Sequence, residues 1–223
     1  MTGALGLASL ALIGCRRSDA DAGYALALGE TGASPDIPSP RPTPTLDETL
    51  GHIRLARAAE VRTLISVRYD PAYVSLDYPG GDVPDNTGVC ADVIIRAYRA
   101  LDTDLQVAIH EDMRANFQAY PTFWGLTRPD RNIDHRRVLN LETYFNRCGD
   151  ALAVDLTDAE IEPGDLASWR VGGHLPHIGI ASTARDSEGR RLFVHNIGAG
   201  PQLEACLDAW PRTGLFRHRP WVS

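Results

Sequence analysis

The sequence predicts an α+β fold in which helices come first along the chain and an antiparallel sheet follows. Apolar residues recur at helical spacing in several segments between residues 46 and 147. Short apolar runs separated by turn residues follow from residue 165 onward, which is typical of strands joined by hairpins. Hydrophobic residues make up 43% of the 223 residues, so the chain can bury the core of one ordinary domain.

Residues 1–15 resemble the signal segment of a bacterial lipoprotein. Gly3 to Gly14 form an uncharged apolar run, shorter than the roughly 20 residues of a membrane-spanning helix and similar in length to a signal-peptide core. The run ends in Leu12-Ile13-Gly14-Cys15, which resembles a lipobox, so Cys15 is the expected lipidation site. No basic residue precedes Arg16, however, and a buried N-terminal helix is the alternative.

Residues 16–45 predict a flexible linker. They are rich in Ala, Gly, Asp, Ser and Pro and end in SPDIPSPRPTPT. Pro at this density prevents helices and central strands alike. A lipid anchor followed by such a linker would hold an exported domain, residues 46–223, in the periplasm or at the cell envelope. The membrane is expected as a partner only through this anchor.

Helices are expected over the first half of this domain. In residues 46–66, Leu50, Ile53 and Val61 recur near helical spacing, and a Pro- and Gly-rich loop follows. The next expected helix, residues 90–101, comes after three residues suited to cap it, Asp85, Asn86 and Thr87. Further helices are expected over residues 105–117 and 141–147.

Strands are expected over the second half. The apolar runs are residues 165–171, 177–183 and 191–197, and residues 213–218 could add another strand. Ser187-Glu188-Gly189 supplies a turn between the second and third runs. Helices followed by an antiparallel sheet make an α+β layout.

The composition excludes several kinds of chemistry. All 22 basic residues are Arg, so a catalytic Lys, a Schiff base and a phosphate-loop Lys are excluded. The net charge of -7 argues against a nucleic-acid partner. The cysteines have no CxxC spacing, which disfavours a zinc ribbon or a redox dithiol, although Cys148 and Cys206 could form a disulfide in an oxidising compartment.

One cysteine and two histidines are the candidate catalytic residues. Cys90 is expected at the start of a helix, where backbone N–H groups and the helix dipole lower the pKa of a thiol and can stabilise an oxyanion. A small buried Cys is the alternative. His177 and His195 are expected on neighbouring antiparallel strands, where one could act as base and the other could orient it.

This order of residues resembles the NlpC-type branch of the papain-like cysteine peptidases. Tyr78-Pro79-Gly80-Gly81 precedes Cys90, and PGDL at residues 163–166, HIGI at 177–180 and FVH at 193–195 resemble motifs of that family. The resemblance implies a papain-like fold with N-terminal helices, including the Cys-bearing helix, packed on an antiparallel sheet. It also implies Cys90 as nucleophile, His177 as base, His195 as orienter and Tyr78 at the oxyanion. Asn196 is an alternative orienter, and strand alternation puts it on the opposite face from His195.

A closer resemblance is to a bacterial family known as domain-of-unknown-function family 1287. The phrases LDYPGGDVP, TGVCADVIIRAYRAL and NIDHRRVLNL carry it, and it spans residues 58–216. The family is similar to NlpC-type enzymes, which implies an exported cysteine amidase or endopeptidase that cleaves peptide amide bonds of peptidoglycan without a cofactor. The sequence departs from the usual NlpC motif, because Val89 precedes Cys90 and the acidic residue follows, as Asp92.

Other interpretations remain open. Cys90, His177 and His195, with His174, could hold zinc in a metal-dependent hydrolase. A wall-binding lipoprotein without turnover and an acyltransferase are further alternatives. The run containing Arg136 and Arg137 is most simply a solvated loop. Since it matches the closer family, it could instead line the cleft and hold a substrate carboxylate.

Overall fold

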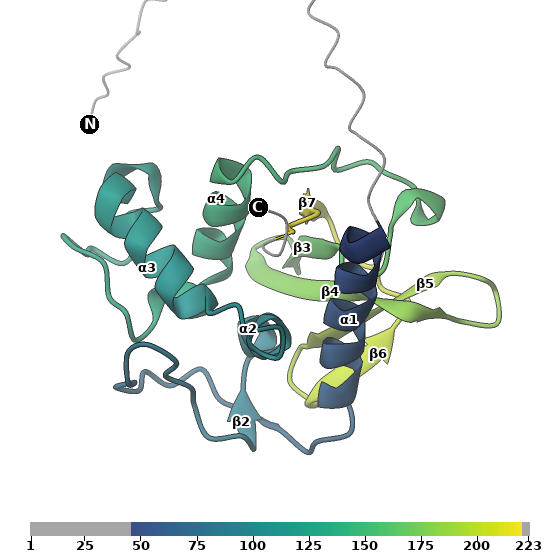
Figure 1. Ribbon diagram of the computed structural model, residues 1–223, viewed down its shortest axis with the longest axis horizontal. Coiled ribbons are helices and arrows are strands. Elements are labelled where there is room, and N and C mark those ends of the chain that lie inside the picture. The colour runs from purple at the N-terminus through teal and green to yellow at the C-terminus, as the bar shows by residue number, and fades with distance from the viewer. Residues whose placement is uncertain (1–45, 220–223) are drawn as a thin grey trace, which may run out of the picture. The chain divides into compact units, whose positions relative to one another are not determined.

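The computed structural model describes residues 46–219, in which four helices accompany a five-stranded antiparallel sheet (Figure 1). The described helices are α1 (Leu46–Arg62), α2 (Cys90–Arg99), α3 (Leu105–Asn116) and α4 (Val138–Arg147). The mixed architecture and its order along the chain are therefore as predicted. The expected signal, linker and lipidation site, Cys15, lie outside the described residues and stay predictions. No helix among residues 46–219 is long and apolar enough to cross a membrane.

The sheet has the strand order β6-β5-β4-β3-β7, and every neighbouring pair is antiparallel. The strands are β3 (Leu166–Val171), β4 (Leu175–Arg185), β5 (Arg191–Asn196), β6 (Pro201–Glu204) and β7 (Arg212–Phe216). Two very short strands, β1 (Arg68–Tyr69) and β2 (Thr87–Gly88), pair in parallel and join the two ends of the loop that precedes α2.

The two faces of the large sheet pack against different partners. Ile178, Ile180 and Val194 face the helices and belong to one buried cluster with α2 residues such as Ile94. Trp169, Ala181 and Phe193 belong to a second buried cluster with the segment around Leu207. Because side chains alternate along a strand, His177 and His195 share the second face, while Asn196 shares the helix face.

The start of α2 is fixed by its own third residue rather than by the residues expected to cap it. Val89 is the N-cap residue, and its N–H donates to the Asp92 carboxylate at 2.6 Å. Asp85, Asn86 and Thr87 make no cap, so that prediction is wrong. A side chain on Gly88 would meet Asp92 at 3.1 Å, and the φ of 156° at this residue is one that L side chains rarely adopt. The backbone therefore enters the helix in one fixed direction just before Cys90.

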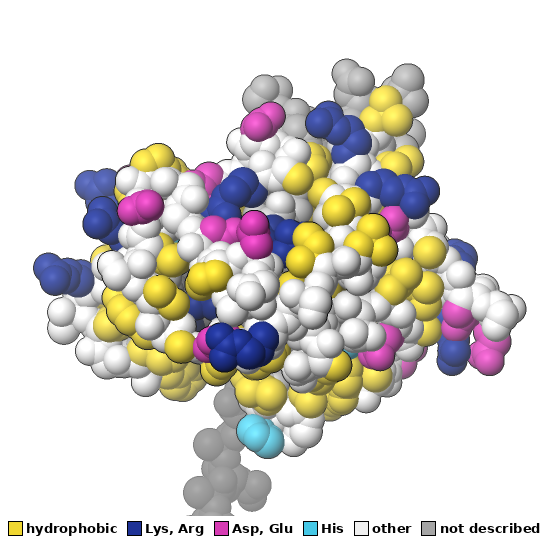
Figure 2. Space-filling view, turned by 90° about the horizontal axis from the view of Figure 1, so that it is seen from below, with side chains coloured by type: hydrophobic (Ala, Val, Ile, Leu, Met, Phe, Trp, Pro, Cys, Tyr) yellow, Lys and Arg dark blue, Asp and Glu magenta, His cyan; other side chains and the backbone are white. Residues whose placement is uncertain are grey.

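One face of the molecule carries Arg and acidic side chains interspersed with apolar ones (Figure 2). That face has no continuous basic stripe of the kind that follows a phosphate backbone. The expectation that nucleic acid is not a partner stays a prediction.

Candidate active site

Cys90 is the first residue of α2 and is buried, with 5% of its surface exposed. Burial raises the pKa of its thiol to about 11, and the Asp92 charge adds to the rise. Hydrogen bonds from the backbone N–H groups of Ile178, Ala91 and Cys90 itself oppose this effect on the pKa. The expected lowering of the thiol pKa at the helix start is therefore wrong for the free protein, because desolvation outweighs the N–H groups.

Two imidazoles form a hydrogen-bonded pair on the opposite face of the sheet. Nε2 of His177 lies 3.0 Å from Nδ1 of His195, and the rings meet edge-on with centroids 5.1 Å apart. Trp169 and Trp210 pack against the His177 ring at 5.8 and 5.7 Å. Strand pairing explains why the two rings are in contact, since His195 lies opposite Gly179, which is two residues after His177 and on the same face of the sheet. A Cβ atom added at Gly179 would lie 3.1 Å from Cβ of His195 and 3.2 Å from the Trp169 ring, so a larger residue would force these side chains to shift.

Glu204 extends the histidine pair into a hydrogen-bonded chain of three side chains. Its Oε2 lies 3.1 Å from Nε2 of His195. A carboxylate can only accept, so Nε2 of His195 carries a proton and its neutral Nδ1 is an acceptor. His177 must then donate from Nε2, which leaves its Nδ1 without a proton. The chain thus fixes His177 in the tautomer whose free nitrogen is a base.

Burial favours the neutral form of both imidazoles. Burial, followed by the charge of His195, lowers the pKa of His177 to about 3. Burial also lowers the pKa of His195, although Glu204 acts in the opposite direction. Burial disfavours the charged forms of the thiol and of the imidazoles alike, which favours proton transfer in step with nucleophilic attack.

Cys90 and His177 approach each other through adjacent residues of β4. The thiol contacts the N–H of Ile178, whose nitrogen is bonded to the carbonyl carbon of His177. The imidazole projects from the other side of the strand, and within residues 46–219 no hydrogen bond joins it to the thiol. The structure therefore brings His177 and His195 together. Cys90 contacts the backbone of the residue after His177 and not the His177 ring.

A cavity of about 370 Å³ opens beside Cys90. Its walls are mainly apolar and come from the loops before α2 and α4 and from the start of β4. They include Tyr69, Pro71, Val89, Cys90, Trp124, Ile133, Arg136, Arg137, Val138, Leu139, Leu175 and Pro176.

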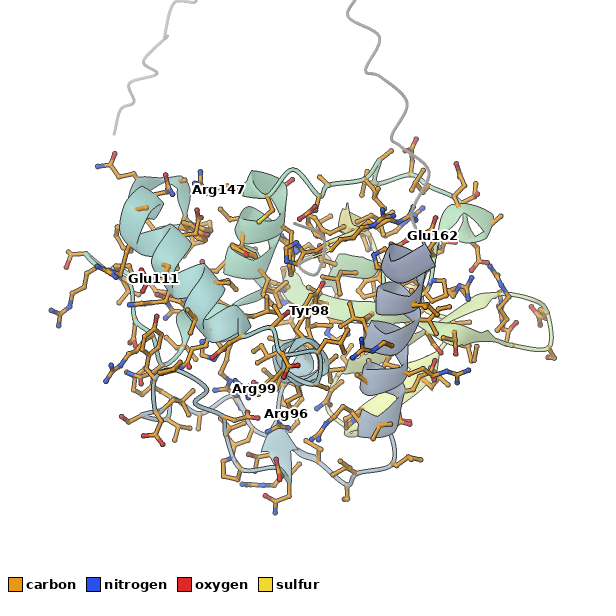
Figure 3. The ribbon with its side chains drawn as sticks, in the orientation of Figure 1. Arg96, Tyr98, Arg99, Glu111, Arg147 and Glu162 are labelled. Carbon is orange, nitrogen blue, oxygen red and sulfur yellow. The ribbon has the colours of Figure 1, made fainter. Side chains whose placement is uncertain are left out.

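Tyr69, rather than Tyr78, is the tyrosine beside the thiol. Tyr69 lines the cavity, and its hydroxyl pKa is raised first by burial and then by Cys90. The hydroxyl of Tyr78 instead donates to Glu111 on α3 at 3.0 Å, and its ring packs edge-on against His110 (Glu111 is labelled in Figure 3). The expectation that Tyr78 lies at the oxyanion position is therefore not met.

Asn196 does not contact the histidines. Its Nδ2 donates to the Gly88 carbonyl at 3.3 Å, and its Oδ1 accepts from the Gly198 N–H at 3.1 Å. It ties the end of β5 to the segment before Cys90. His195, and not Asn196, is therefore the residue that hydrogen-bonds the His177 ring.

The run that contains Arg136 and Arg137 is not a solvated loop, because Asp134, His135 and Arg136 are all buried. Arg136 forms a two-pronged ion pair with Asp92, at 2.8 and 2.9 Å, so it is not free to hold a substrate carboxylate. Arg137 pairs with Asp134 at 2.8 Å and lies over the Trp124 ring, 4.0 Å from its centroid, at the cavity wall. Only Arg137 remains a candidate for substrate contact.

The ligands proposed for zinc do not converge. Among the described residues, only Cys148, Asp150 and His218 bring three candidate ligand atoms together. His174 is exposed, with its Nδ1 3.0 Å from the Gly172 carbonyl oxygen. The structure therefore does not bring Cys90, His177, His195 and His174 together as a set of metal ligands. Cys148 and Cys206 are both free thiols, so the expected disulfide is wrong.

Comparisons with known proteins confirm the resemblance to domain-of-unknown-function family 1287. The family model described as "Domain of unknown function (DUF1287)" matches residues 56–218. An Escherichia coli (strain K12) protein, "Uncharacterized protein YijF", is 45% identical over 195 residues, which cover 86% of this chain and 95% of that protein. No solved structure matches the chain.

Proposed function

The chain belongs to the DUF1287 family, and from the chemistry of its site we propose that it is an exported cysteine hydrolase that cleaves peptide amide bonds of bacterial peptidoglycan. The fold proposed with this activity is papain-like, of the NlpC type. The lipid anchor at Cys15 and a location in the periplasm or cell envelope are part of the same proposal.

One observation carries the proposal. A buried thiol at a helix start accepts hydrogen bonds from three backbone N–H groups, one of them that of Ile178, the residue after His177, whose imidazole has a nitrogen free to act as a base. Converging N–H groups suit the negative charge that develops when a thiol attacks a carbonyl. The adjoining cavity gives an acyl group access to Cys90.

The residues act in a defined order in this mechanism. Sγ of Cys90 attacks the amide carbonyl carbon and its proton passes to Nδ1 of His177. Because this imidazole projects from the other side of β4 in the free protein, the transfer requires the ring to turn toward the thiol when substrate binds. The oxyanion accepts hydrogen bonds from the backbone N–H groups at the start of α2. The C–N bond then breaks, the amine leaves with the proton held by His177, and the acyl group stays on sulfur. Water attacks the thioester with His177 again as base, which frees the acid and restores the thiol. Catalytic hydrogen bonds often tighten only when substrate binds.

The cavity favours a peptide with an anionic end. Arg137, held over Trp124, supplies a cation beside Cys90, and a guanidinium can bind a carboxylate through two hydrogen bonds. Peptidoglycan stem peptides carry such carboxylates. The apolar walls fit their small side chains.

The test is digestion of purified peptidoglycan, followed by mass spectrometry of the released muropeptides. The wild-type chain should release peptides, while Cys90→Ala and a thiol-alkylated sample should release none. Cys206→Ala, which removes a buried thiol that does not line the cavity, is the matched control and should keep activity. Full activity in Cys90→Ala would refute the proposal, and a folded wild type without turnover would favour a wall-binding protein.

A further inference from the structure

A second group of reactive side chains lies where α4 ends and β7 leaves the sheet. Cys148 is the residue directly after α4, Asp150 is two residues further on, and His218 follows β7 by two residues. One candidate ligand atom from each of these residues lies within 4.8 Å of those from the other two. Arg147, labelled in Figure 3, is the last residue of α4 and marks this end of the helix.

Backbone hydrogen bonds hold the two chain segments together. The Arg217 N–H donates to the Asp150 carbonyl at 2.9 Å, and the Leu152 N–H donates to the Leu215 carbonyl at 2.8 Å. The two segments thus form a short antiparallel pairing beside the sheet. These hydrogen bonds fix the backbone positions from which Asp150 and His218 project.

His218 is a buried imidazole with one nitrogen engaged and one not. Only 7% of its surface is exposed, and its ring packs against Tyr98, Tyr144 and Phe145, with centroids 5.6, 5.7 and 5.1 Å away. Its Nδ1 lies 2.5 Å from a carboxylate oxygen of Asp150, whereas its Nε2 is buried without a hydrogen-bond partner. A buried nitrogen with no partner is uncommon and points to a group that binds there.

We propose that Cys148, Asp150 and His218 form a zinc site. Thiolate sulfur, carboxylate oxygen and imidazole nitrogen are the donors that zinc takes in proteins, whereas calcium and magnesium prefer oxygen alone. Cys148 is exposed, so an ion can reach the group from solvent. Cys148 binds as thiolate and releases its proton, and a water molecule completes four-coordination.

The neighbouring side chains support this geometry. The Tyr144 hydroxyl hydrogen-bonds the Cys148 sulfur, and such outer contacts orient metal ligands. Bound zinc would join the end of α4 to the segment after β7. Its role is therefore to stabilise the folded domain, independently of chemistry at Cys90.

The experiment titrates Co²⁺, and then Zn²⁺ in competition, into the reduced, untagged, metal-free full chain. One equivalent of Co²⁺ should bind with a thiolate-to-cobalt absorption band, Zn²⁺ should displace it, and Zn²⁺ should raise the thermal midpoint. Each of the four cysteines is replaced by Ala in turn. Cys148→Ala should abolish the band, and the other three variants should keep it.

Asp150→Asn should weaken Co²⁺ binding at least tenfold, and circular dichroism checks that the variant is folded. Three results would overturn the proposal: no stoichiometric binding by the wild type, a band that survives Cys148→Ala, or a band lost in Cys90→Ala. Loss of the band in Cys90→Ala would show that Cys90, the proposed nucleophile, binds the metal. Peptidoglycan digestion measures the proposed hydrolase separately, so either proposal can fail alone.

Discussion

Replacing Asp92 with Asn should destabilise the whole domain, because it breaks a buried ion pair. The side chains of Asp92 and Arg136 are 3% and 2% exposed and share hydrogen bonds of 2.8 and 2.9 Å. Arg136 cannot lose its charge, so the substitution leaves a buried cation without its partner. Removing one member of a buried pair costs about 3–5 kcal/mol.

That loss is large against the total stability of a domain, which is typically about 5–15 kcal/mol. In a domain of this size each kcal/mol lowers the melting temperature by about 2–4 °C, so Asp92→Asn should lower it by about 6–20 °C. The measurement is urea and thermal unfolding followed by circular dichroism.

Two further variants make the result specific. Glu188→Gln also removes one carboxylate charge, from a surface pair 3.4 Å long in which Glu188 is 69% exposed, and should cost less than about 1 kcal/mol. The double variant Asp92→Asn/Arg136→Gln removes both buried charges and should be more stable than Asp92→Asn alone. If Asp92→Asn lost no more stability than Glu188→Gln, the assigned role of the pair would be wrong.

Three other predictions concern the site. Because the pKa of Cys90 is about 11, its alkylation rate, followed by mass spectrometry of its peptide, should rise through pH 9 and level off only near pH 11; a plateau by pH 9 would contradict this. The pKa of His177 is lowered from 6.5 to about 3, so its contribution to stability is present above pH 6.5 and is lost as the pH falls toward 3. His177→Gln should therefore lose less stability than the wild type between pH 7 and pH 4 in urea unfolding, and equal losses would refute the shift. Glu204→Ala should lower kcat by about 10–100-fold with little change in KM. In the same variant, nitrogen NMR should show both tautomers of the His177 ring. An unchanged tautomer would show that Glu204 does not set the proton positions of the two histidines.

The pairing of the two histidines could be predicted from sequence, and the tyrosine could not. Alternation along two strands joined by a turn is enough to put His177 and His195 on one face. The choice between Tyr69 and Tyr78 depends on how the long loop before α2 closes. Parallel pairing sets Tyr69 opposite Gly88, which precedes Cys90 by two residues. No local pattern marks a two-residue strand.

Glu204 was missed because β6 has no strand pattern of its own. The strand is four residues long, begins with Pro201 and has exposed residues at its end. Its pairing with β5 creates it, and the register sets Gln202 opposite His195. A short apolar run bounded by turn residues, the signal that predicts β3, β4 and β5, is absent from such an edge strand.

Charge is a misleading guide to the run that ends in Arg137 and includes Arg136. Four ionisable residues in a row usually mean a surface, yet the buried carboxylate of Asp92 lies 44 positions earlier in the chain and receives the guanidinium. In the sequence, Asp92 stands out only as a departure from a motif. Its burial and its partner depend on long-range packing, which spacing does not reveal.

The position of Glu204 on the edge strand makes one end of the histidine chain responsive to ionic strength. Its side chain is 53% exposed, so dissolved salt screens its attraction for His195. The inner contact between His177 and His195 lies behind Trp169 and Trp210, where screening is weak. Salt in the medium can thus alter which nitrogen of a fully enclosed imidazole holds its proton, without any change in the fold around it.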